Sequence, residues 1–64
     1  MRLSFNGKKK VVKVDGKIGV AELLEKSGIS RESVVVKRNG KLVPENEKVG
    51  GNDEMEIIQV VFGG

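Results

Sequence analysis

The stretch MEIIQVVFGG, residues 55–64, decides how this 64-residue chain can fold. Residues 55–62 are apolar on both faces of an extended strand, apart from Glu56 and Gln59. Such a run is typical of a central strand that is covered on at least one side. The rest of the chain must therefore supply neighbouring strands and an element that covers the sheet.

The covering element is one short helix, predicted over residues 20–27. Val20, Leu23 and Leu24 follow the i, i+3, i+4 spacing that places apolar side chains on a single helical stripe. Gly28 follows as the predicted C-terminal cap, since glycine readily adopts the left-handed conformation that ends many helices. No other segment predicts a helix convincingly.

Two Asn-Gly pairs predict two hairpins, because Asn and Gly tolerate the positive φ angles of tight turns. The segment 45–53, after the second hairpin, is predicted to be an irregular connection to the last strand. The predicted hairpin strands are Arg2–Phe5 and 9–14 around Asn6-Gly7, and Val34–Arg38 and Lys41–Val43 around Asn39-Gly40.

The register of the first hairpin depends on its turn. A two-residue turn places Lys8 opposite Phe5, and so sets a lysine against an apolar side chain. A three-residue loop with a bulge places Val11 opposite Leu3 instead. We therefore predict the bulged loop.

The second hairpin predicts which side chains reach the core. A two-residue turn places Val34, Val36 and Val43 together on the core face. The same register leaves Val35 and Leu42 on the opposite face. That is an unexpected place for Leu42 unless something binds there.

The order of elements is ββαββ with a final strand, which defines an α+β fold with one main helix on one mixed sheet of four to five strands. A β-grasp, or ubiquitin-like, arrangement is the most economical form of this layout. Residues 1–62 form the predicted β-grasp domain, and residues 63–64 form a flexible diglycine tail. A domain this small has a thin core, so a deep catalytic pocket is not expected.

The amino-acid composition excludes several kinds of catalytic and metal-binding site. The chain contains no cysteine and no histidine, which excludes disulfides, thiol nucleophiles, imidazole catalysis and Cys or His metal sites. We expect no catalytic residue, no metal and no cofactor bound by the chain itself. No apolar run approaches the ~20 residues that span a bilayer, and no secretory signal is visible, so a cytoplasmic monomer without membrane contact is expected.

The formal net charge is +3, and one region is markedly basic. Such a cluster is typical either of a surface that binds nucleic acid or of an edge strand protected from aggregation by lysine. The second interpretation is favoured, because the chain has no Trp or Tyr and only two Phe to stack on bases. The clustered residues are Lys8, Lys9, Lys10, Lys13 and Lys17.

The end of the chain has its own chemistry. Gly63 and Gly64 follow directly on a hydrophobic strand, so they extend from a rigid body. A terminal carboxylate becomes reactive once ATP activates it as an acyl-adenylate, in the cleft of another enzyme. Two residues without Cβ let the backbone enter a narrow channel there. The tail is therefore predicted to be the site, with Gly64 as the reacting residue.

Several segments together resemble the ThiS and MoaD family of ubiquitin-like sulfur carriers, which also includes ubiquitin-related modifiers and archaeal small modifier proteins. The resemblance covers essentially the whole chain and is closest to the ThiS pattern. No proline precedes the final glycines, as it usually does in MoaD-like tails. The matching segments are LSFNG (3–7), VAELL (20–24), VVVKRNGKLVP (34–44), NDEMEII (52–58) and QVVFGG (59–64).

This resemblance implies a reaction sequence and its partners. A ubiquitin-activating-type adenylating enzyme would use ATP to form the Gly64 acyl-adenylate. A sulfur donor, either a cysteine desulfurase or a rhodanese-type protein, would convert it to a thiocarboxylate. A downstream synthase or thiotransferase would then pass the sulfur to thiamine thiazole, molybdopterin or a tRNA base.

The resemblance also implies a docking surface. Family members bind the activating enzyme through an apolar patch on the open face of the sheet, and Phe5, Leu42 and Ile58 match that patch by position. Ordinary core packing is the competing interpretation for Phe5 and Ile58. Val60 and Phe62 are candidates to accompany the tail into the partner's cleft.

Other functions stay open at this level. In modifier-type relatives the same carboxylate of Gly64 is joined to a substrate lysine. A small basic RNA-binding module would use the lysine-rich hairpin and lose affinity steeply with salt. A structural adaptor would not need its tail, and a free-standing enzyme is disfavoured because no pocket is expected.

Overall fold

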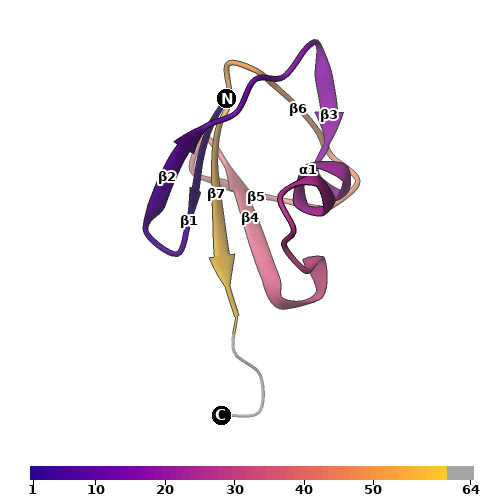
Figure 1. Cartoon of the computed structure of the whole chain (residues 1–64). Coiled ribbons are helices and arrows are strands. Elements are labelled where there is room, and N and C mark those ends of the chain that lie inside the picture. The colour runs from indigo at the N-terminus through magenta and orange to yellow at the C-terminus, as the bar shows by residue number, and fades with distance from the viewer. Residues whose placement is uncertain (61–64) are drawn as a thin grey trace.

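A five-stranded mixed sheet with one helix packed against it forms the body of the protein (Figure 1). The computed structural model describes residues 1–60. The strands of the large sheet lie in the order β2-β1-β7-β4-β5, with β1 and β7 parallel and the other pairs antiparallel. The elements are β1 (Arg2–Phe5), β2 (Lys8–Val11), β3 (Lys17–Gly19), α1 (Val20–Lys26), the 3-10 helix η1 (Arg31–Ser33), β4 (Val34–Arg38), β5 (Lys41–Val43), β6 (Lys48–Gly50) and β7 (Glu54–Gln59).

The prediction of an α+β, β-grasp fold is therefore confirmed. The last strand is central, as its apolar composition indicated: β7 lies between β1 and β4. It begins at Glu54, one residue before the predicted start, and ends at Gln59. Of the remaining predicted strand residues, Val60 lies just beyond β7, and residues 61–62 lie outside the described residues.

The core lies between α1 and the sheet. Val20, Leu23 and Leu24 of the helix are each no more than 2% exposed, which confirms the predicted stripe. The sheet contributes Leu3, Val36, Met55 and Ile57, while Met1 and Val49 complete the buried set.

The helix ends one residue before the predicted boundary, and its termination follows a Schellman motif. Ser27 is the C-cap, and Gly28 follows with a φ of +73°. The Gly28 N–H donates to the Glu25 carbonyl at 3.1 Å, and the Ile29 N–H donates to the Leu24 carbonyl at 2.9 Å. The prediction of Gly28 as the C-terminal cap is therefore confirmed.

The bulged loop predicted for the first hairpin is wrong. Asn6 and Gly7 form a two-residue turn with φ angles of +51° and +79°, and Phe5 lies opposite Lys8. Because β2 is an edge strand whose four side chains are all exposed, matching apolar partners across this hairpin gains little. The two-residue register instead turns Val12 toward the core, beside the buried Met1.

The register predicted for the second hairpin is confirmed. Val36 lies opposite Val43, and Lys37 lies opposite Leu42. Val36 is buried, whereas Val35 is 39% and Leu42 is 67% exposed. The type I′ geometry follows from the positive φ of Asn39 and Gly40, at +50° and +85°.

A second, two-stranded sheet was not predicted. β3 and β6 pair antiparallel, so the connection expected to be irregular over 45–53 contains a strand. Each strand has only three residues, too few for a periodic pattern to show in the sequence. The chain beside β6 also caps α1: the Val20 N–H donates to the Glu47 carbonyl at 2.8 Å, and the Ala21 N–H donates to the Glu45 carbonyl at 3.0 Å.

Candidate functional site

The backbone is held against β4 as far as Val60, the last residue that the structure describes. The Val60 N–H donates to the Ser33 carbonyl at 2.7 Å, which continues the β4–β7 ladder by one step beyond Gln59. The first hairpin flanks the same end, since the Asn6 side-chain amide donates to the Gln59 side chain at 3.2 Å. The predicted tail residues Phe62, Gly63 and Gly64 lie outside the described residues.

An apolar patch lies on the face of the sheet that α1 does not cover. Ile58 of β7 lies directly opposite Val35 of β4, and Leu42 of β5 lies on the same face one strand further out. Ile58 is half-buried, Val35 is 39% exposed and Leu42 is 67% exposed. Val60 is half-buried, and strand alternation places it on this face as well. We call Val35, Leu42, Ile58 and Val60 the open-face patch.

The other end of this face carries charge. Lys37 lies opposite Glu56 of β7 and also opposite Leu42 of β5, so this charged pair adjoins the open-face patch on the side away from the chain's exit. Over β2, β1 and β7 the face is hollowed into a shallow depression of about 440 Å³. Its lining includes Arg2, Lys9 and Glu54. The face therefore combines an apolar end beside the exit with a charged end of mixed sign.

The predicted interface residues are divided between two faces. Leu42, Ile58 and Val60 share the open face. Phe5 lies opposite Ile57, which is 2% exposed, and packs half-buried against the core. The structure thus places Phe5 on the helix side of the sheet, away from the other three.

One member of the open-face patch was not singled out from the sequence as an interface residue. Val35 lies on this face between Ile58 of β7 and Leu42 of β5, diagonal to Leu42, whose direct partner on β4 is Lys37. The signal was present, because the register of the second hairpin predicted Val35 on the same face as Leu42. Only the pairing of β4 with β7 shows that Val35 lies directly opposite Ile58.

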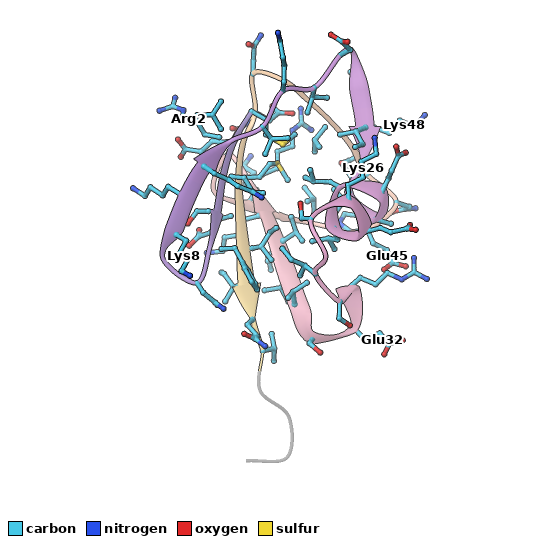
Figure 2. All side chains as sticks on the ribbon, in the orientation of Figure 1. Arg2, Lys8, Lys26, Glu32, Glu45 and Lys48 are labelled. Atoms are coloured by element: carbon cyan, nitrogen blue, oxygen red, sulfur yellow. The ribbon has the colours of Figure 1, made fainter. Side chains whose placement is uncertain are left out.

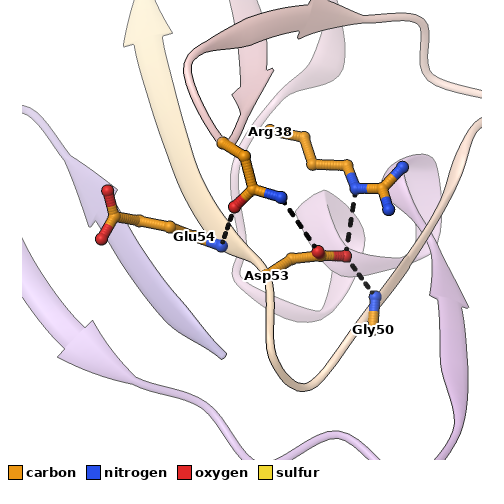
Figure 3. Close-up of polar contacts among 5 residues, drawn as sticks. Arg38, Gly50, Asp53 and Glu54 are labelled. Atoms are coloured by element: carbon orange, nitrogen blue, oxygen red, sulfur yellow. Dashed lines mark hydrogen bonds and ion pairs between the residues drawn. The ribbon is translucent and has the colours of Figure 1, made fainter.

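At the end of β7 far from the exit, a polar network holds the second hairpin (Figure 3). The Asn39 side-chain oxygen accepts the Glu54 N–H at 2.9 Å, and its amide donates to Asp53 at 3.2 Å. The Gly50 N–H donates to Asp53 at 2.7 Å, and Arg38 forms an ion pair with the same carboxylate at 3.2 Å.

The hydrogen bond from the Gly50 N–H is the largest effect and lowers the pKa of Asp53 below its usual 3.8; burial opposes it, and Asn39 and Arg38 add to the lowering. This network lies at the opposite end of β7 from the exit and stabilises the structure without reaching the tail.

Two further findings concern the side chains and the helices of residues 1–60. Within them, no three His, Cys, Asp or Glu side chains are grouped so that they could hold a metal ion. No helix in this part of the chain combines the length and the apolar character needed to span a membrane. This part of the chain presents an exposed apolar patch beside the point where β7 ends.

These features define a small ubiquitin-like domain whose open sheet face and C-terminal exit are adjacent. Among known protein families, the sequence model of the ThiS family matches residues 3–64 of this chain. The chain belongs to the ThiS family.

Solved structures agree with this assignment. The chain is similar to the crystal structure of the thiamine biosynthesis protein ThiS from Geobacter metallireducens, with 29% identity, a TM-score of 0.68 and coverage of 100% of this chain and 99% of that one. It is also similar to a solution structure of a thiamine biosynthesis protein from the same organism. That match has 26% identity, a TM-score of 0.56 and coverage of 100% of this chain and 86% of the other.

Proposed function

We propose that this chain is a sulfur carrier of thiamine biosynthesis that acts through the carboxylate of Gly64. The observation that carries the proposal is the match to the ThiS family over residues 3–64, which includes the diglycine end. The geometry supports it, because the backbone is held in the sheet as far as Val60 and leaves beside an apolar surface. A sulfur carrier needs both features, because its partner enzyme must recognise a surface of the domain and modify the C-terminal carboxylate.

The proposed chemistry has two steps, both in the cleft of a ubiquitin-activating-type adenylating enzyme. The Gly64 carboxylate attacks the α-phosphate of ATP, forming an acyl-adenylate and releasing pyrophosphate. In the second step the terminal sulfur of a persulfide on a cysteine desulfurase or a rhodanese-type donor attacks the acyl carbon and displaces AMP, and a second thiol then reduces the resulting acyl disulfide, leaving the thiocarboxylate and a disulfide on the donor. The product is a thiocarboxylate in which sulfur has replaced one terminal oxygen, ready for a downstream synthase.

The chain itself acts as a co-substrate in this scheme and not as the catalyst. It binds no ATP of its own, and it supplies the carboxylate, the reach of the two glycines and the surface that orients them. The residues we assign to docking are Leu42, Ile58 and Val60, with Val35 completing the open-face patch. Phe5 is left out of this assignment because it packs against the core.

Intact-mass spectrometry tests the proposal, and the absence of cysteine makes the test unusually clean. The purified chain is incubated with ATP, a sulfide source and the adenylating enzyme of the same organism, then treated with iodoacetamide. A gain of one alkyl group reports a thiocarboxylate, because the chain has no thiol. This readout also separates the product from oxidation of Met1 or Met55, which adds nearly the same mass as the exchange of oxygen for sulfur.

The matched control is the chain lacking Gly64, which should fold normally and take up neither sulfur nor label. No labelling by an enzyme shown to be active would refute the carrier proposal. An adduct to lysine side chains of other proteins, formed without sulfide, would indicate a protein modifier conjugated through Gly64 instead.

A further inference from the structure

The outer edge of β2 is open along its whole length. β2 is the outermost strand of the large sheet, and no segment of residues 1–60 lies beyond it (Figure 1). All four of its side chains are exposed. A strand with this position presents unpaired backbone N–H and C=O groups to solvent.

The register identifies which backbone groups are free. Met1 and Val12 exchange two hydrogen bonds, with the Val12 N–H donating at 2.9 Å and the Met1 amino group donating at 3.0 Å. In an antiparallel ladder every second residue makes such an exchange, so Lys10 and Lys8 also direct their backbone groups toward β1. The N–H and C=O groups of Lys9 and Val11 therefore point outward.

The charge along this edge is not neutralised within the described part of the chain. In residues 1–60 the ion pairs involve Arg2, Lys26, Arg31 and Arg38, and none involves a lysine of the first hairpin or of the segment that follows it. Figure 2 shows Lys8 at the hairpin end of β2. The exposed and unpaired side chains are Lys8, Lys9, Lys10, Lys13 and Lys17.

One apolar residue is placed among these lysines. Val11 is 82% exposed, more than Leu42 or Val35. A strand edge that served only to prevent aggregation would gain from a polar residue at this position. Strand alternation puts Val11 with Lys9 on the open face, and Lys8 with Lys10 on the helix side.

We propose that the β2 edge binds an extended acidic polypeptide segment as a sixth strand of the sheet. The backbone of the segment pairs with the free groups of Lys9 and Val11. Its carboxylates, on one face, lie against Lys8 and Lys10, and an apolar side chain on the other face covers Val11. This surface is separate from the tail and goes beyond the carrier function, since binding here needs neither Gly64 nor the open-face patch.

The charges and composition argue against other occupants. A second copy of the chain would bring lysine against lysine at the shared edge, which is unfavourable. Single-stranded RNA would find positive charge but no Tyr or Trp for stacking. An acidic strand would pair its carboxylates with the lysines, hydrogen-bond to the free backbone groups and cover Val11 at the same time.

The probe is an acetylated, amidated eight-residue peptide of alternating glutamate and valine, titrated into the ¹⁵N-labelled chain. We expect amide shifts centred on Lys9 and Val11, and slower hydrogen exchange at those two amides. The amides of Lys8 and Lys10 already face β1 and should change little. Shifts centred elsewhere, or equal binding by a lysine–valine peptide, would overturn the proposal.

Two variants separate backbone pairing from charge. Val11→Pro removes an outward N–H that β1 does not use, and proline is tolerated at such edge positions. It should abolish the slower exchange at Lys9 while the thermal unfolding transition persists. The double variant Lys8→Glu/Lys10→Glu should weaken peptide binding about tenfold, whereas Lys41→Glu, on the other edge strand, should change it by less than about twofold.

The comparison with RNA decides between the two kinds of partner. A short oligouridylate is titrated into the same variants. If it binds more tightly than the acidic peptide and is unaffected by Val11→Pro, the edge is an electrostatic site for polyanions and strand addition is wrong. If the double charge variant fails to fold, Val11→Pro and the lysine–valine peptide still test the proposal.

Discussion

Replacing Leu42 by alanine tests the open-face patch as the docking surface for the adenylating enzyme. Leu42 is 67% exposed in the free protein, so its side chain contributes little to the core. The substitution should therefore change the free energy of unfolding by no more than about 0.5 kcal/mol. Its effect should appear only when a partner covers this face.

The size of that effect follows from the exposed fraction. Leu→Ala removes three carbon atoms, and burial of each is worth about 0.8 kcal/mol. About two-thirds of this burial is still available to a partner. The lost binding free energy is then about 1.6 kcal/mol, or about a fifteenfold rise in Kd.

Isothermal titration calorimetry of each variant against the adenylating enzyme measures this change, with thermal unfolding as the check on stability. The matched control is Lys41→Ala, because Lys41 is exposed on the same strand but alternates to the other face. We expect the control to keep its affinity within about twofold. An unchanged Kd for Leu42→Ala, with both variants folded, would refute the assignment of the open face as the interface.

Three further substitutions test which interactions stabilise the folded domain. Leu23→Ala should lower the free energy of unfolding by about 2–5 kcal/mol, because the side chain is 2% exposed, and chemical denaturation should show a clear shift in midpoint. Gly28→Ala should cost about 1 kcal/mol, since the C-terminal cap of α1 requires a φ of +73°; a thermal transition equal to that of the unmodified chain would contradict the cap. Asp53→Asn should be destabilising at neutral pH and progressively less so in acid. The pKa of Asp53 is lowered by folding, so the carboxylate stabilises the folded state fully above its usual pKa of 3.8, and this stabilisation is lost as the pH falls through the lower folded pKa. Urea denaturation of both proteins between pH 7 and pH 2 measures the difference, and a gap that widened toward acid would contradict the role of the Gly50 hydrogen bond.

Some features of the fold follow from local sequence because their causes are local. The helix stripe of Val20, Leu23 and Leu24 depends only on helical periodicity, and both Asn-Gly turns depend on the conformational freedom of those two residue types. The exposure of Leu42 was predictable for the same reason, since a two-residue turn fixes the register of the strands beside it.

Other features depend on what lies next to a segment in space. The register of the first hairpin was mispredicted because pairing Val11 with Leu3 would matter only if β2 were covered by the core. The short strands β3 and β6 could not be predicted from their own three residues, since each is stabilised mainly by the other. The capping of α1 by the carbonyls of Glu47 and Glu45 likewise joins residues that are far apart in sequence.

The sequence by itself determined the fold class, the ThiS resemblance and the diglycine end. Helical periodicity, turn residues and the order of segments can all be recognised along the chain without knowing which residues are neighbours in space. Only the tertiary structure decided that Val35 lies opposite Ile58, that Phe5 belongs to the core side, and that the edge of β2 is free. Each of these depends on which strands become neighbours and on which side the helix covers. Those choices are made by the burial of the whole core, which no single segment specifies.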